Sequence, residues 1–269
     1  MADAGNSWVE QLYYYFVESV HYSPNLFGLK TDPENKLPYQ QVLEKVRRYE
    51  VPLNGVLNIS LRVFPTRIIS GFLNCFLDTQ KVDFCTSLTL RHYLVDIDRK
   101  VAFAQPDTTL EDENTRIFIE MKVGDNLELS QIWKYVMLLA RWNLATEERR
   151  KPYLLLLTKK PIKAQWVTKE RNIIFINNDG IDNLLTYLKN ARIQRSPRMS
   201  KDEFYRLKKE AKWVCDNLTI GATTWTEIGQ YFQTELDKLR GELQTEFSET
   251  GDKLISDLLQ EFRNRKLLD

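Results

Sequence analysis

Two charged residues stand inside residues 117–123, IFIEMKV, a stretch that otherwise has the composition of a buried strand. β-Branched and aromatic residues dominate it and neither Gly nor Pro interrupts it, which favours a strand. Residues two apart in a strand point to the same face, so Glu120 and Lys122 are expected to project side by side. Charges in a buried element are costly unless they are paired or bind something. These two side chains are therefore candidates for chemistry.

A further carboxylate is expected close to Glu120. Pro106 and Asp107 close the preceding strand, AFAQPD, and a polar loop over TTLEDENT would form a hairpin with Asp107 beside Glu120. Two adjacent carboxylates repel each other unless a cation lies between them, and such hard oxygen ligands suit Mg²⁺ or Mn²⁺. The backbone carbonyl of Met121 would add a third ligand. Lys122 would help to deprotonate the attacking water or stabilise the charge that builds on a phosphate.

These residues resemble a known motif. Pro106-Asp107, twelve further residues and then Glu120-Met121-Lys122 is similar to the PD-(D/E)XK nuclease superfamily, which has the restriction-endonuclease-like fold. Gln131 and Tyr135 lie one helical turn apart on the next expected helix, and this Gln-x-x-x-Tyr pair resembles that of the RecB-like exonuclease branch. The resemblance spans about residues 83–189. It implies metal-dependent phosphodiester hydrolysis, with Gln131 and Tyr135 positioning the substrate.

Neither the charged pair nor the tyrosine requires this interpretation. Glu120 and Lys122 would also suit an ion pair on the exposed face of an antiparallel sheet, although Phe118 shares their face. Tyr135 taken singly favours core packing. The family often carries a further metal-binding glutamate on the helix before the first core strand, and residues 66–77 contain none. Glu44, or Glu10 and Glu18 in the first helix, are the alternatives, and a second metal stays open.

The elements around the motif predict an α/β fold. A meander of strands followed by a strand–helix–strand unit predicts a mixed sheet with helices on its faces, the restriction-endonuclease-like core. We expect three parts: residues 1–80 as a helical region packed on the core, 81–192 as the nuclease-like core, and 200–269 as a helical region. The expected helices are 7–22, 39–50, 66–77, 130–144 and 179–193, and the expected strands are 83–97, 100–107, 116–123, 151–160 and 172–178.

An apolar stripe runs through the C-terminal region. Its members recur every three or four residues, as in an amphipathic helix, with a break expected near Gly251: Ile228, Phe232, Leu236, Leu239, Leu243, Phe247, Leu254, Leu258 and Phe262. One interpretation is a helix packed back on the body of the protein. The other is a coiled-coil hairpin that forms a homo-oligomer or binds a partner, which Gly241 within the stripe weakens.

The charge pattern suggests a polyanionic partner. Net charge over the 269 residues is only +1, yet residues 141–171 and 189–212 are rich in Lys and Arg and the region after 227 is acidic. The basic blocks would neutralise phosphates. Nearby aromatic residues would stack on unpaired bases, although each taken singly favours packing: Trp142, Tyr153, Trp166 and Trp213.

Several classes of protein are disfavoured. Three Cys without paired spacing and two His argue against zinc and iron–sulfur sites. Nucleotide-binding and serine-hydrolase motifs are absent from the sequence. Neither a signal peptide nor an 18-residue apolar run is recognisable, so we expect a soluble intracellular protein, in cytoplasm or nucleus, that does not enter membranes.

Three functions remain. The first is a Mg²⁺- or Mn²⁺-dependent nuclease acting on DNA, with RNA as a further possible substrate. The second is a nucleic-acid-binding member of the same fold that has lost catalysis. The third is an interaction protein that assembles through the C-terminal helices, residues 215–269.

Overall fold

A computed structural model provides the structure of the protein. It describes residues 7–9, 12–13, 41, 43–44, 47, 50–77, 89–91, 106–123, 129–161, 201–241 and 246–268. The strand expected over 172–178 and the helix expected over 179–193 lie outside the described residues, as do most of the first helix and the strand expected up to residue 105.

The chain divides into two compact units. Unit 1 combines both ends of the chain, Met1–Ile69 and Thr224–Asp269, and unit 2 is the continuous stretch Ser70–Thr223. The sequence alone predicts three consecutive parts, residues 1–80, 81–192 and 200–269.

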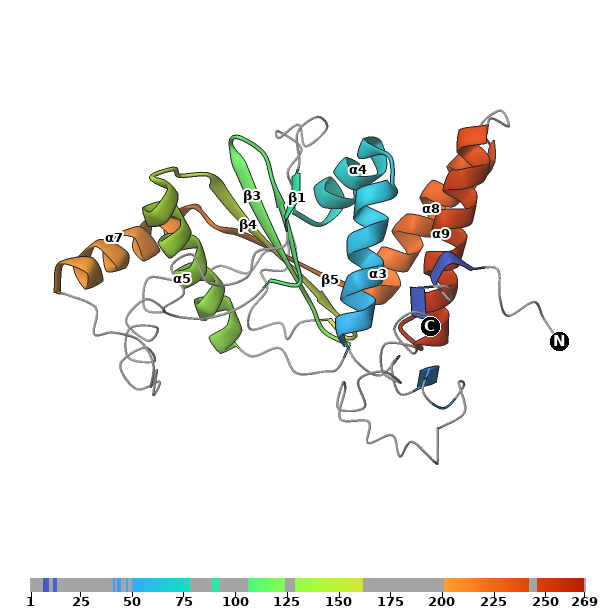
Figure 1. Cartoon of the computed structure of the whole chain (residues 1–269), viewed down its shortest axis with the longest axis horizontal. Coiled ribbons are helices and arrows are strands. Elements are labelled where there is room, and N and C mark those ends of the chain that lie inside the picture. The colour runs from blue at the N-terminus through green and yellow to red at the C-terminus, as the bar shows by residue number, and fades with distance from the viewer. Residues whose placement is uncertain are drawn as a thin grey trace. The chain divides into compact units, whose positions relative to one another are not determined.

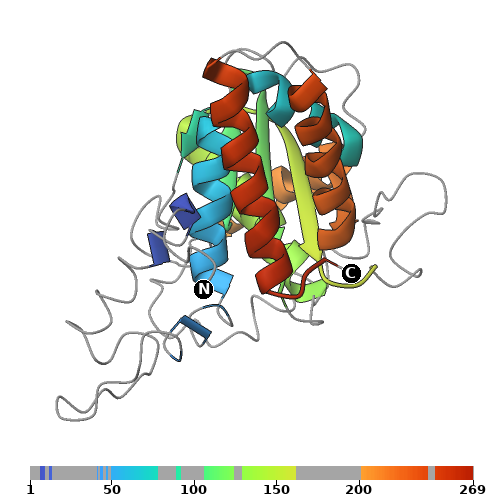
Figure 2. The same cartoon turned by 90° about the vertical axis from the view of Figure 1, so that its right-hand side faces the viewer.

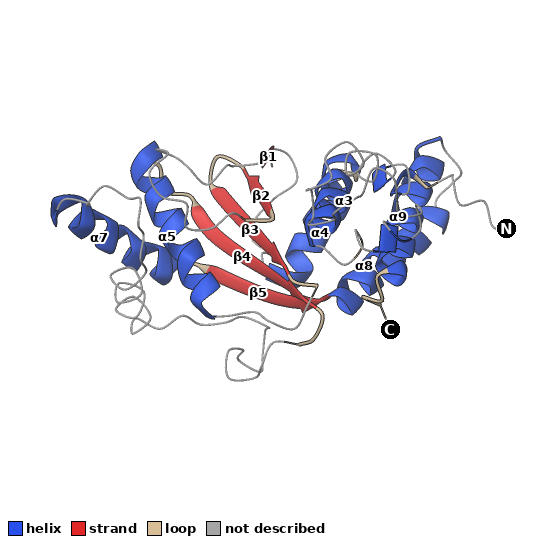
Figure 3. Ribbon diagram, turned by 60° about the horizontal axis from the view of Figure 1, so that its bottom comes forward, coloured by secondary structure: helices blue, strands red, loops and turns tan. Residues whose placement is uncertain are grey.

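Unit 2 is built on a mixed, open sheet (Figures 1 and 3). Its strands are β1 Thr89–Arg91, β2 Thr108–Glu111, β3 Thr115–Met121, β4 Lys151–Thr158 and β5 Thr219–Thr224, and they lie in that order across the sheet. The pairs β1–β2 and β2–β3 are antiparallel, and β3–β4 is parallel. The prediction of an α/β fold with helices flanking a mixed sheet is confirmed.

Two helices cover the sheet face on which Phe118 lies. They are α5, Leu129–Thr146, which connects β3 to β4, and α7, Lys201–Asn217. Phe118 and Leu154 of the sheet pack with Val136 of α5 and Leu207 of α7 in one buried cluster. The crossover that joins the parallel strands β3 and β4 contains α5. Because both α5 and the sheet carry apolar residues, the helix packs against the sheet beside β3.

The hairpin between β2 and β3 differs from the expected one. Asp107 precedes β2 instead of closing a strand, and Thr108–Glu111, expected in the loop, form the strand itself. The turn is short because the Asp112 side chain accepts hydrogen bonds from the backbone N–H groups of Asn114 and Thr115, at 2.8 and 2.6 Å. Such a side-chain bond replaces the longer polar loop.

Strand β5 lies in the C-terminal region that the sequence analysis expected to be helical. Apart from Ile220, its residues, TIGATT, are small or polar, and they show no alternating apolar pattern. The glycine at position 221 is required by close packing, because a Cβ there would lie 2.1 Å from the Phe76 carbonyl oxygen near the end of helix α4, Thr66–Leu77. A close approach of two backbones requires glycine.

Unit 1 is helical (Figure 2). Helices α8, Trp225–Gly241, and α9, Glu246–Asn264, pack on each other, and α9 contacts α3, Glu50–Val63. The apolar stripe is buried here: Ile228, Phe232, Leu236 and Leu239 from α8 and Leu258 and Phe262 from α9. In the described part of unit 1, these residues therefore pack inside the protein, as a helix packed back on the body of the protein would.

The break in the stripe lies between α8 and α9, and not at Gly251. Helix α9 continues through Gly251, where a Cβ would lie 3.2 Å from Leu239 Cδ1. Glycine therefore marks a close approach of the two helices, which a sequence pattern cannot distinguish from a helix end.

Both ends of the chain meet in a buried polar cluster of unit 1. The Tyr13 hydroxyl donates to Glu261 Oε1 at 2.8 Å, and Arg265 Nε bonds the same oxygen at 2.6 Å. Arg47 pairs with Glu261 Oε2 at 3.2 Å. Burial, followed by the charge of Glu261, raises the pKa of Tyr13 well above its ordinary value, so the hydroxyl stays protonated.

Within the described residues, no single helix is both long and apolar enough to cross a membrane. The two helical segments Pro52–Leu61 and Thr66–Leu77, which meet at a sharp bend, reach the required length and apolar composition only when they are taken together.

Candidate active site

Asp107 lies beside the end of β3. The register pairs Thr108 with Ile119, which places Asp107 directly across from Glu120. The backbone N–H of Met121 donates to Asp107 Oδ2 at 2.7 Å. This bond holds the Asp107 carboxylate against the Glu120–Met121 peptide, so the hairpin places Asp107 next to the backbone of Glu120, its predicted neighbour.

Glu120 is buried, at 4% exposure, and its carboxylate has a partner on each oxygen. Lys122 Nζ pairs with Oε1 at 2.8 Å. The Tyr135 hydroxyl, from α5, donates to Oε2. The pair is therefore neither exposed nor cross-strand, and these partners offset part of the cost of burying the charge.

Tyr135 packs and hydrogen-bonds at the same time. Its ring meets Phe118 edge-on, with centroids 6.0 Å apart, while its hydroxyl reaches Glu120. Packing alone, which the sequence favoured for this residue, accounts for the ring but not for the hydroxyl. Tyr135 thus links α5 to the charged end of β3.

The structure describes the other predicted site residues to different extents. Met121 is the last residue of β3 and its side chain is fully buried, so only its backbone is available to a ligand. Gln131 lies in α5, one turn before Tyr135, and its side chain is outside what the structure describes. Glu44 is exposed, whereas Glu10 and Glu18 fall outside the described residues.

The donor set of this site suits a hard cation. Among the described residues, no group of three or more Asp, Glu, His or Cys side chains comes together, and the site offers the two carboxylates of Asp107 and Glu120. Mg²⁺ keeps several waters and is commonly held by one or two carboxylates together with substrate phosphates. Two carboxylates therefore fit such an ion.

A second charged cluster occupies the opposite end of β3. Arg116 and Glu111, directly opposed in the hairpin and each 2% exposed, pair at 3.2 Å, and Arg150 Nη1 reaches the same Glu111 oxygen at 3.1 Å. The Arg116 guanidinium lies 3.7 Å from the centroid of the Trp142 ring. The sequence analysis missed this cluster, although Arg116 shares the alternation of Phe118, Glu120 and Lys122 and was a usable signal.

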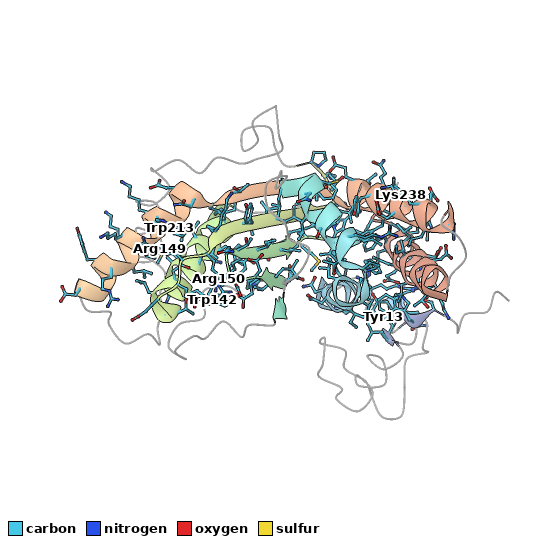
Figure 4. The ribbon with its side chains drawn as sticks, turned by 90° about the horizontal axis from the view of Figure 1, so that it is seen from above. Tyr13, Trp142, Arg149, Arg150, Trp213 and Lys238 are labelled. Carbon is cyan, nitrogen blue, oxygen red and sulfur yellow. The ribbon has the colours of Figure 1, made fainter. Side chains whose placement is uncertain are left out.

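A third cluster fastens α7 to α5 (Figure 4). Arg149 donates to both oxygens of Glu210, at 2.8 Å from Nη2 and 3.1 Å from Nε, and Asn143 donates to it at 3.0 Å. Burial by itself would raise the pKa of Glu210, but the hydrogen bonds from Arg149 and Asn143 outweigh it and lower the pKa. Glu210 therefore stays ionised and committed to this contact.

The aromatic residues proposed for base stacking are mostly packed. Trp142 and Tyr153 are buried, at 4% and 1% exposure, and so cannot stack on bases in this structure. Trp213 is half-buried beside Arg149, and Trp166 lies outside the described residues.

Comparison with known proteins adds no relative: neither a family model, nor a curated protein, nor a solved structure matches this chain.

Proposed function

We propose that this protein is a metal-dependent nuclease of the PD-(D/E)XK type that hydrolyses phosphodiester bonds in DNA. The observation that carries the proposal is the hydrogen bond from the Met121 N–H to Asp107 Oδ2, at 2.7 Å, across from Glu120. Motif residues 13 positions apart in the sequence thereby share one end of a hairpin, with Lys122 bonded to Glu120.

Each residue has a role that follows from its chemistry. Asp107 and Glu120 would hold Mg²⁺ or Mn²⁺, together with the Met121 carbonyl, and the ion would supply a Lewis acid and an activated water. Lys122, half-buried beside Glu120, would stabilise negative charge that builds on the phosphate or accept a proton from the attacking water. Tyr135 would hold the Glu120 carboxylate in one orientation, and Gln131 would position the strand.

Cleavage of defined substrates tests the proposal. Single-stranded, duplex and supercoiled DNA, and a single-stranded RNA, are incubated with Mg²⁺, Mn²⁺ or EDTA. We expect cleavage that requires metal and is lost in Asp107→Asn, Glu120→Gln and Lys122→Met. Tyr153→Phe is the matched control, because Tyr153 lies on the neighbouring strand and its partner in the register, Ile117, points away from the Glu120 face. Cleavage at the wild-type rate in the three site variants would contradict the assignment.

One observation favours a second candidate, a nucleic-acid-binding protein of the same fold without catalysis. Lys122 and Tyr135 already bond the two oxygens of Glu120, so the buried charge is balanced by the chain itself. Calorimetric titration with Mn²⁺ separates the candidates. The nuclease requires a binding site that Asp107→Asn removes, and the non-catalytic protein predicts that wild type and variant titrate alike.

A further inference from the structure

One face of α7 combines positive charge with an exposed aromatic ring. Leu207, Ala211 and Val214 are buried against α5, so the opposite face of the helix is open. On it, Tyr205, Lys208, Lys209 and Lys212 are all exposed and fall at helical spacings of three and four, which makes them one stripe. Tyr205 is 72% exposed, more than any other large hydrophobic residue in the described part of the chain.

Two cations of this helix face keep their charge without an ion pair among the described residues. Glu210, the acidic residue at its centre, turns to the buried side and is held by Arg149 and Asn143. Arg206, also exposed, and Lys212 form no ion pair with any residue that the structure describes. Among the α7 side chains that the structure describes, the exposed acidic ones are Asp202 and Asp216, which lie three residues before Tyr205 and four residues after Lys212. Like charges at these spacings destabilise a helix, so packing does not explain them.

The chemistry of the stripe selects one kind of partner. We propose that the Tyr205–Lys212 face of α7 is a binding surface for single-stranded nucleic acid. Regularly spaced lysines complement a phosphate backbone, and an exposed ring among them offers a stacking platform for an unpaired base. A membrane surface fits poorly, because the apolar face that would enter the lipid is buried against α5.

The surface is rigidly mounted and separate from the candidate active site. The Arg149–Glu210–Asn143 contacts fix α7 to the C-terminal half of α5, which presents the lysines in one geometry and lowers the entropic cost of binding. Asn143 stands eight residues after Tyr135 on that helix, about 12 Å along its axis. The inference rests on the proposed nucleic-acid function but not on the proposed cleavage reaction at Asp107 and Glu120.

Binding without metal tests the surface. Anisotropy of a labelled 15-nucleotide oligo-dT is measured in EDTA over a series of KCl concentrations. The triple variant K208Q/K209Q/K212Q is expected to bind at least tenfold more weakly, and the slope of log affinity against log salt to fall by about 2, since each phosphate contact on a single strand contributes about 0.7. Tyr205→Ala is expected to weaken binding about tenfold with the slope unchanged.

Matched controls separate this surface from the active site. Lys238→Gln removes an exposed lysine from α8 and should leave the affinity unchanged. Glu120→Gln should keep oligo-dT binding and lose cleavage. Cleavage that persists in Glu120→Gln, while the triple variant loses binding, overturns the proposed active site and supports the α7 surface.

Three results would overturn the α7 surface. The first is oligo-dT binding by the wild type that the triple variant leaves intact, and the second is no binding at 50 mM KCl. The third is equal competition by polyglutamate or by phosphatidylserine vesicles at matched charge, which would mean that the lysines attract any anion. Circular dichroism of each variant checks that the protein keeps the helix content of the wild type.

Discussion

The hydroxyl of Tyr135 connects helix α5 to the carboxylate of Glu120. Removing it as Tyr135→Phe keeps the ring packing on Phe118 and removes the hydrogen bond to Glu120 Oε2. On the proposed function, we expect kcat for DNA cleavage to fall by about tenfold or more with KM nearly unchanged, because the hydroxyl would orient the proposed metal-binding carboxylate of Glu120 without touching substrate.

Steady-state kinetics of Tyr135→Phe beside Tyr153→Phe checks this expectation. A rise in KM at constant kcat would instead mean that Tyr135 binds substrate directly. Equal activity of Tyr135→Phe and wild type would limit the residue to packing. Mn²⁺ affinity by calorimetry offers a second measurement that does not depend on turnover.

Cys215 and Cys75 should differ in reactivity. Burial, with a further contribution from the charge of Asp216, raises the pKa of the Cys215 thiol to about 12, whereas Cys75 is exposed. Since only the thiolate is nucleophilic, iodoacetamide at pH 8 should alkylate Cys75 well before Cys215 in the native protein. Peptide mass spectrometry measures both sites, and urea should make Cys215 reactive. Equal native labelling of the two residues would contradict the burial of Cys215.

The same thiol makes stability depend on pH. The native state keeps a proton that the unfolded chain, with a thiol pKa of about 8.5, has lost. Because the native state binds more protons, the free energy of unfolding should fall as pH rises from about 9 toward 12. Urea unfolding across this range should show a shallower decline in Cys215→Ala.

At the level of single residues, the sequence predicts Asp107 as a neighbour of Glu120, and the roles given to both residues stay predictions. Asp107 lies across from Glu120 even though the predicted loop was wrong, because register depends on the centre of a hairpin and not on where its strands end. The pairing of Arg149 with Glu210 could not be predicted, since it joins positions 61 apart in the chain through the packing of two helices.

Among the elements, long periodic segments were predictable and short polar ones were not. Helix α5 and strand β4 carry strong apolar patterns, and their expected positions match closely. Strand β5 carries none, and its place in the sheet depends on its neighbour β4. Such a strand forms because it pairs with neighbouring strands, since its local sequence has little strand preference of its own.

The end of α9 offers a stabilising substitution. Lys266 follows the helix with a φ of 55°, and its N–H bonds the Arg263 carbonyl at 2.8 Å while that of Leu267 bonds Phe262 at 3.0 Å. This is a Schellman arrangement, in which glycine is favoured. Lys266→Gly should raise the free energy of unfolding by about 0.5–1 kcal/mol, because a Cβ is disfavoured at positive φ.

Urea denaturation checks the Lys266→Gly prediction. Lys266→Ala is its control, since it removes the charge but keeps the Cβ, and it should bring no gain. Equal stabilisation by both substitutions would mean that the lysine charge, and not the backbone conformation, is unfavourable.

At the scale of the whole molecule, the Tyr13 cluster holds unit 1 together across 248 positions of sequence. Tyr13→Phe removes a buried hydroxyl that contacts both Glu261 and Arg265 and leaves those two residues paired with each other. We expect a loss of about 1–2 kcal/mol in the free energy of unfolding, from hydrogen bonds to charged groups that are no longer made.

Urea unfolding followed by circular dichroism measures this loss. Tyr205→Phe is the control, because its hydroxyl is on an exposed side chain, and it should change stability by less than about 0.5 kcal/mol. Equal effects of the two substitutions would show that the Tyr13 cluster contributes nothing specific.

Assembly into oligomers stays a prediction, although the apolar stripe assigned to it is buried in unit 1.

The two-part construction of unit 1 has a consequence for synthesis on the ribosome. Helix α3 is made well before α8 and α9, the helices that complete the core of unit 1. At about 5–20 residues per second, the apolar side chains of α3 wait roughly ten seconds or longer for their partners. A nascent chain therefore exposes an unfinished surface while unit 2 folds, which makes the first helices a target for chaperones and leaves any prematurely terminated chain recognisable as incomplete.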